Sequence, residues 1–111
     1  MERDQITMTV ARNIEAIMER KRMKAPEVAR RAGINATGIY DILSGKSRSP
    51  KIETLGKIAK ALDVPVALLF EKAEEAEVRR EIVSLFARLP EDERLRLIVT
   101  ARAWLGDKTP A

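Results

Sequence analysis

The chain has 111 residues, of which 45% are hydrophobic and 34% are charged, a balance that predicts one small domain with a core and a short appended element. It contains no cysteine and no histidine, which excludes disulfides and removes the commonest general base and metal ligand. No apolar run approaches the roughly 18 residues of a membrane-spanning helix, and the first residues lack the layout of a secretory signal. We therefore expect a cytoplasmic protein that is not an enzyme and that uses no metal, no cofactor and no small-molecule ligand.

Positive charge is concentrated in the first part of the chain. Residues 1–70 carry 13 Lys and Arg against 8 Asp and Glu, whereas residues 71–111 carry 8 against 9. From Arg20 to Arg48, eight basic residues are accompanied by only two acidic ones. Such an excess is typical of a surface that binds a polyanion, although a solvated basic face has the same composition.

The first half of the chain predicts three helices. An amphipathic helix is expected over residues 7–22, where apolar residues recur at helical spacing: Val10, Ile14, Ile17 and Met18. Pro26 is acceptable only in a first turn, so a second helix is expected over residues 24–32. Asn35 is a preferred N-cap residue and begins a third helix that runs to about Ser44.

The next segment predicts two more helices. After a polar and basic loop over residues 46–50, a fourth helix is expected to end at Leu62, and Pro65 begins a fifth that reaches Phe70. No stretch alternates apolar and β-branched residues with polar ones in the way a half-buried strand does. Residues 1–72 are therefore expected to form an all-α, five-helix bundle.

The remaining residues, 73–111, predict a separate helical segment. One helix is expected to end at Leu89 and another to run from Glu91 to Leu105, because Pro90 interrupts the helical pattern. Their apolar side chains are too numerous to remain in water, so they either fold back on the bundle or mediate self-association. We expect a dimer interface made of Ile82, Leu85, Phe86, Leu95, Ile98, Trp104 and Leu105.

A helix-turn-helix over residues 25–44 is the strongest motif in the sequence. Two short helices that cross steeply need a small residue at their contact, which Ala29 supplies, and a tight turn, for which Gly33 tolerates positive φ. Ile39 and Ile42, three residues apart, then attach the second of these helices to the body of the domain. These four framework residues at these spacings are more specific than any of them alone.

The motif and the residues after it resemble the phage repressor/Cro-like helix-turn-helix family, the xenobiotic-response-element type of transcriptional regulator. The similarity continues through IYDILSGK at residues 39–46 and TLGKIAKALDV at residues 54–64, and it covers about residues 7–71. It implies a lambda-repressor-like bundle, here with two additional C-terminal helices, whose third helix enters the major groove of double-stranded DNA.

The resemblance also implies which residues contact DNA. Base edges are expected to meet the first part of the third helix, at Asn35, Ala36, Thr37, Tyr40 and Asp41. Phosphates are expected to meet the residues that flank it, namely Lys24, Ser44, Lys46, Arg48 and Lys51. N–H groups at the start of the second helix are expected to add a further phosphate contact.

Three features depart from the family pattern. Ala25 stands where the family commonly has a glutamine that binds the DNA backbone. Gly38 lies inside the third helix, where glycine costs about 1 kcal/mol relative to alanine. The same helix has no Arg or Gln, the usual bidentate readers of bases, so DNA shape is expected to contribute to recognition.

Together these patterns predict a sequence-specific transcriptional regulator associated with the bacterial nucleoid. The expected form is a prophage-type repressor that binds a palindromic operator as a homodimer, because a two-fold operator needs two recognition helices. Two alternatives stay open: an antitoxin that represses its own operon, and a protein-interaction adaptor on the same fold. The basic cluster argues against the adaptor, which has no need of it.

Overall fold

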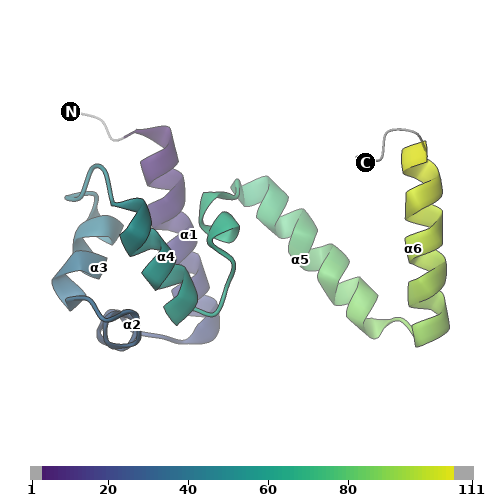
Figure 1. Cartoon of the computed structure of the whole chain (residues 1–111), viewed down its shortest axis with the longest axis horizontal. Coiled ribbons are helices and arrows are strands. Elements are labelled where there is room, and N and C mark those ends of the chain that lie inside the picture. Colours follow the sequence, from purple (N-terminus) through teal and green to yellow (C-terminus); the bar gives the residue numbers. More distant parts are fainter. Residues whose placement is uncertain (1–3, 107–111) are drawn as a thin grey trace. The chain divides into compact units, whose positions relative to one another are not determined.

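The computed structural model describes residues 4–106. In chain order the helices are α1 (Gln5–Lys21), α2 (Ala25–Ala32), α3 (Ala36–Ser44), α4 (Ile52–Ala61), η1 (Val66–Phe70), α5 (Ala73–Arg88) and α6 (Glu91–Leu105), as Figure 1 shows. Nowhere between residues 4 and 106 is there a strand. The predicted all-α fold class is therefore confirmed.

The predicted fifth helix is a 3-10 helix, η1, rather than an α-helix. Pro65 precedes it, and the N–H group of Leu68 donates to the carbonyl oxygen of Pro65 at 3.0 Å, the three-residue spacing of a 3-10 turn. The segment has five residues before Glu71 returns to extended backbone. In a segment of five residues, the hydrogen bonds of an α-helix, which join residues four positions apart, can hardly repeat.

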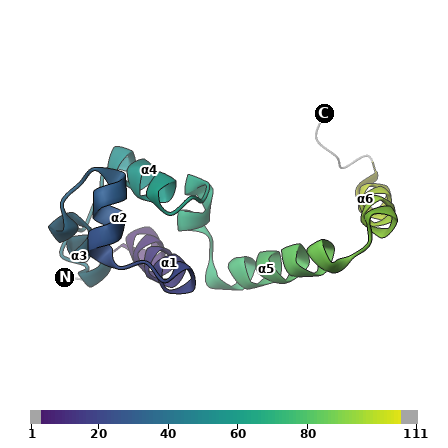
Figure 2. The same ribbon diagram turned by 90° about the horizontal axis from the view of Figure 1, so that it is seen from below.

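The first of two compact units, Met1–Ala76, contains the hydrophobic core. The five helices that precede α5 each contribute one side chain with no exposed surface: Ile14, Val28, Ile39, Ile58 and Leu69. Within this unit α1 packs on α3 and η1, α2 packs on α3 and α4, and α4 packs on η1 (Figures 1 and 2). Burying one such side chain stabilises the fold by about 1.5–3 kcal/mol. Each helix of the bundle is therefore held in place by packing against its neighbours.

One buried polar side chain connects α1 to the end of the bundle. The side-chain amide of Asn13 donates to the carbonyl oxygens of Leu69 (2.8 Å) and Glu71 (2.7 Å). With these two bonds the side chain satisfies the carbonyl of Leu69, the core residue of η1, and that of Glu71, which follows η1. Asn13 therefore fixes the chain at the point where it leaves η1 and approaches α5.

Three helices of the bundle end in the same way. A residue in the left-handed region follows each of α1, α2 and α4: Arg22 (φ 55°), Gly33 (φ 73°) and Asp63 (φ 57°). The next residue donates its N–H group to a carbonyl five residues earlier, at 2.9 to 3.0 Å, and packs on the core: Met23, Ile34 and Val64. Each helix end thus combines a left-handed backbone with an apolar anchor.

The second unit, Glu77–Ala111, is a helical pair whose turn is closed by one arginine. The guanidinium of Arg94 donates to the carbonyl oxygens of Phe86 (3.0 Å) and Ala87 (2.7 Å), which lie at the end of α5. It also lies over the Phe86 ring, 5.6 Å from its centroid. The Phe86 carbonyl also accepts from the Leu89 N–H group at 3.2 Å, so Arg94 adds side-chain donors to carbonyls at the end of α5.

Two glycines of the helix-turn-helix are expected to respond to alanine in opposite directions. A Cβ at Gly38 would find its nearest neighbour, Ile34 Cδ1, at 3.9 Å, so Gly38→Ala should stabilise the fold by about 0.5–1 kcal/mol. At Gly33 space is also free, but φ is +73°, so Gly33→Ala should destabilise by about 1 kcal/mol. Urea denaturation of both variants tests this, and a loss of stability in Gly38→Ala would contradict it.

Candidate nucleic-acid interface

The frame of the helix-turn-helix is built from buried side chains and one left-handed residue. Ala29 and Ile42 are each 3% exposed and Ile39 is fully buried, while Gly33 ends α2 in the left-handed region. Since Ile39 and Ile42 lie three residues apart on α3, they turn one side of that helix into the core. The opposite side of α3 consequently faces solvent.

The first part of α3 presents polar side chains that the fold does not use. Asn35, Thr37 and Tyr40 are exposed, whereas Ala36 and Asp41 are half-buried. Asn35 occupies the N-cap position, yet its side chain makes no capping hydrogen bond, and its backbone carbonyl accepts from the Gly38 N–H group instead. The five residues predicted to meet base edges therefore lie together, with the Asn35 amide left out of helix capping.

The basic loop after α3 is attached at two points. The hydroxyl of Thr7 on α1 donates to the carbonyl oxygen of Arg48 at 3.1 Å, and the Ser47 N–H group donates to the carbonyl oxygen of Asp41 at 2.9 Å. Lys46 and Arg48 are exposed on this loop. The backbone of this loop is thus held against α1 and α3, while the Lys46 and Arg48 side chains are exposed.

The remaining predicted phosphate contacts differ in how free their polar groups are. Lys24 and Lys51 are exposed and occupy the N-cap positions of α2 and α4. The Ser44 hydroxyl donates to the Asp41 carbonyl and accepts from the Lys46 N–H group, both at 3.4 Å, so it already takes part in the local turn. Its availability to a phosphate is lower than that of the lysines.

The start of α2 has fewer main-chain donors than the sequence analysis expected. Pro26 has no N–H group, and the Glu27 N–H group donates to the carbonyl oxygen of Lys24 at 3.0 Å. The Glu27 carboxylate in turn pairs with Arg31 at 2.9 Å. Charge at this end of α2 therefore comes mainly from the Lys24 side chain.

An open groove of about 660 Å³ lies between α1, α2 and α3. Tyr40 and Lys24 line it, as do two glutamates of α1, Glu15 and Glu19. Both glutamates are exposed. The sequence analysis did not single them out, although their four-residue spacing indicates that they share one face of α1.

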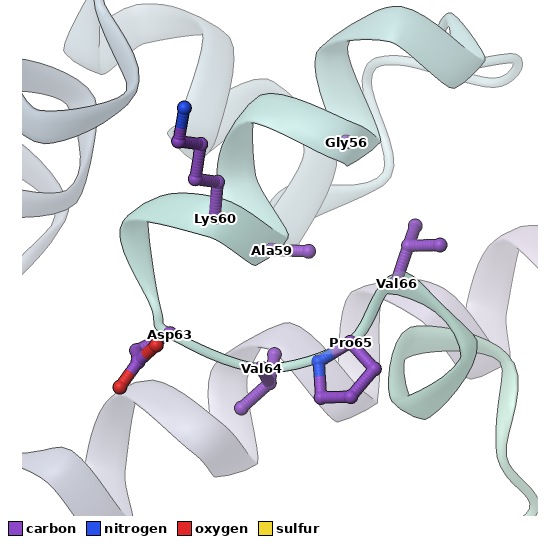
Figure 3. A pocket seen from close by; sticks show the side chains of 7 residues that line it. All are labelled: Gly56, Ala59, Lys60, Asp63, Val64, Pro65 and Val66. Carbon is purple, nitrogen blue, oxygen red and sulfur yellow. The ribbon is translucent and has the colours of Figure 1, made fainter.

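A second groove, of about 590 Å³, lies along α4 and the segment that follows it (Figure 3). Its lining is mostly aliphatic, with Val64, Pro65 and Val66 on one side. The charged groups of Lys60 and Asp63 point away from one another in Figure 3. None of its lining residues is among the predicted DNA contacts.

Two further findings apply only to the described residues. Among them, no set of three or more acidic side chains is placed to hold a metal ion. No helix within this part of the chain combines the length and the apolar character needed to cross a membrane.

Comparison with known proteins agrees with this geometry. The family model of the Cro/C1-type HTH DNA-binding domain matches residues 13–71. The chain belongs to this family. The resemblance seen in the sequence is thereby confirmed, and in a Cro/C1-type domain α2 and α3 form the helix-turn-helix, with α3 as the recognition helix.

Two individual proteins are similar to the chain over more residues than the Cro/C1-type family model matches. The HTH-type transcriptional repressor RghR of Bacillus subtilis (strain 168) is 32% identical over 91 residues, which make up 82% of this chain and 64% of RghR. The solved SinR protein/SinI protein complex contains a chain with a similar fold, with a TM-score of 0.54 and 20% identity. That likeness covers 86% of this chain and 95% of the other.

Removing the Thr7 hydroxyl is expected to loosen the basic loop of the Cro/C1-type domain. Thr7→Val keeps the shape of the side chain but leaves the Arg48 carbonyl without this donor, which should cost about 1 kcal/mol. Hydrogen exchange should become faster at residues 46–49 and stay unchanged in α4. Unchanged exchange in the loop would show that this hydrogen bond does not hold it.

Proposed function

We propose that the chain is a sequence-specific transcriptional repressor of prophage type, which binds a palindromic operator as a homodimer in the bacterial nucleoid. The observation that carries the proposal is the exposed first part of α3, whose polar side chains the fold leaves unused, beside an anchored basic loop. A repressor of this kind blocks transcription by occupying DNA and needs no chemistry of its own.

Base recognition is assigned to Asn35, Ala36, Thr37, Tyr40 and Asp41. The Asn35 amide matches the donor and acceptor pair of adenine, Thr37 can donate or accept, and Asp41 can accept from a cytosine amino group. Phosphate contact is assigned to Lys24, Ser44, Lys46, Arg48 and Lys51. Because the base readers are few and weakly polar, sequence-dependent DNA shape contributes to the choice of operator.

The similarity to RghR, an HTH-type transcriptional repressor, supports the regulatory part of the proposal. The similarity spans 64% of the length of RghR, so the role of the whole of that protein comes to this chain only as part of the proposal. The DNA-binding domain is assigned to residues 1–72 and the dimerisation segment to residues 73–111.

Dimerisation is assigned to apolar side chains of the second unit. No residue of α6 is buried, and Trp104 at its end is 76% exposed. Exposed apolar surface of this kind is typical of an interface. The residues assigned to it are Ile82, Leu85, Phe86, Leu95, Ile98, Trp104 and Leu105.

A different protein is the main rival for the same apolar side chains. A solved structure of similar fold is a complex of two proteins, SinR and SinI, which supports a protein partner as a second candidate for α5 and α6. An antitoxin would use these helices to bind a toxin and would still bind DNA. An adaptor would bind a partner and show no DNA binding at low salt.

Substitutions at the residues assigned to bases and at those assigned to phosphates should differ in how binding depends on DNA sequence and on salt. In fluorescence anisotropy on the region upstream of the gene, Thr37→Ala should lose roughly fivefold affinity for the operator and little for unrelated DNA. Lys46→Ala should weaken binding to both and lower the salt slope by about 1. Lys60→Ala, which removes the same charge at the other groove, is the matched control. Absence of any DNA binding at low salt would refute the proposal.

The assignment of the dimer interface can be tested with two adjacent residues of α5. Ile82 and Val83 are each 57% exposed, but only Ile82 belongs to the assigned interface. Ile82→Glu should convert a dimer to a monomer in light scattering at micromolar concentration, because it places a charge in an apolar contact. Val83→Glu should leave the dimer intact. A monomeric wild-type chain would refute dimerisation and favour a heterologous partner.

A further inference from the structure

The groove beside the recognition helix brings negative charge to the edge of the proposed DNA-binding surface. Glu15 and Glu19 of α1 line the same groove as Lys24 and Tyr40, which are assigned to a phosphate and to a base edge. Residues 1–70 carry 13 Lys and Arg against 8 Asp and Glu, and a carboxylate at this place opposes the approach of a phosphate. The two glutamates therefore require an explanation.

No contact among the described residues explains why these two positions are occupied by glutamate. Neither carboxylate has an ion-pair partner within residues 4–106, and both are exposed. Like charges four residues apart repel one another on a helix surface. Glu19 also lies in the last turns of α1, which ends at Lys21, where the helix dipole disfavours an anion. Both features cost stability, and the structure shows no compensating contact.

We propose that Glu15 and Glu19 limit the affinity of the chain for DNA. Their carboxylates repel the phosphates that Lys24 attracts, so the α1 edge of the surface contributes little to binding. Attraction is then confined to the loop and α4 side of the recognition helix, where Lys46, Arg48 and Lys51 lie. The repulsion depends on phosphates and not on bases, so it acts on operator and unrelated DNA alike. This inference rests on the proposed function.

Coulomb's law sets the expected size of the effect. A carboxylate within about 10 Å of a phosphate, in surroundings close to water, changes the binding constant roughly twofold at low salt. At an ionic strength of 1 M the screening length is about 3 Å, so the effect should disappear. An affinity gain that vanishes with salt is thus the signature of this mechanism.

The experiment compares isosteric variants of the full chain. Binding of Glu15→Gln, Glu19→Gln and the double variant is measured by fluorescence anisotropy on the upstream region and on an unrelated duplex of equal length. We expect a gain of roughly twofold for each single variant and about fourfold for the double variant, on both duplexes, at low salt. Glu74→Gln, which removes an exposed carboxylate from the first turn of α5, is the control and should leave affinity unchanged.

A second measurement separates this inference from an effect on folding. Because the glutamates cost α1 stability, the glutamine variants should melt at the same temperature as the wild type or higher. Glu19→Lys should bind DNA more tightly than Glu19→Gln, since it replaces repulsion with attraction. An electrostatic effect predicts this order of the two affinities, whereas an effect of side-chain shape does not.

Each contrary result has a distinct meaning. Variants that bind like the wild type, or no better than Glu74→Gln, would overturn the inference and leave the proposed function intact. Weaker binding of the glutamine variants would also overturn it, because the carboxylates would then accept hydrogen bonds from bases. A wild-type chain that binds neither duplex would overturn both.

Discussion

The burial of Ile39 and Ile42 determines how the rest of the bundle presents α3. These side chains occupy one side of a short helix and enter a core that also receives Ile14 and Ile58 from α1 and α4. A helix of nine residues has little stability of its own, so its position depends on this packing. Once that side is buried, the residues between the isoleucines have to face outward. The packing of its buried side thus decides which residues of α3 are exposed.

Most of the bundle could be predicted from the sequence, because its signals are local. Apolar spacing and capping residues indicated the helices, and the framework residues of the helix-turn-helix indicated the fold. The conformation of η1 could not be predicted in this way, since a five-residue apolar segment after Pro65 suits an α-helical turn and a 3-10 turn equally well. The hydrogen bond from Asn13 to the Glu71 carbonyl, which follows this segment, joins residues 58 positions apart and is likewise not visible in local spacing.

The candidate site was predictable in its positions and less so in its hydrogen bonds. Sequence spacing located the residues of α3, but it could not show that Asn35 leaves its helix uncapped or that the Ser44 hydroxyl is used in a turn. Contacts between segments that are distant in the sequence could not be predicted from spacing either. The hydrogen bond from Thr7 to Arg48 joins residues 41 positions apart, and the groove combines Glu15 with Tyr40. Such pairs depend on tertiary packing, which one sequence does not display.

The shared form of the helix ends has a consequence for how this chain can change. At Gly33 and Ile34, the residue that ends α2 and the residue that anchors the turn are adjacent, and α3 begins two positions later. One residue inserted between the anchor and Ala36 would rotate α3 by about 100° if the helix simply started one residue later, and Ile39 and Ile42 would turn away from the core with it. The turn therefore has a fixed length, and the proposed DNA contacts of α3 can change by exchange of its side chains but not by lengthening of this turn.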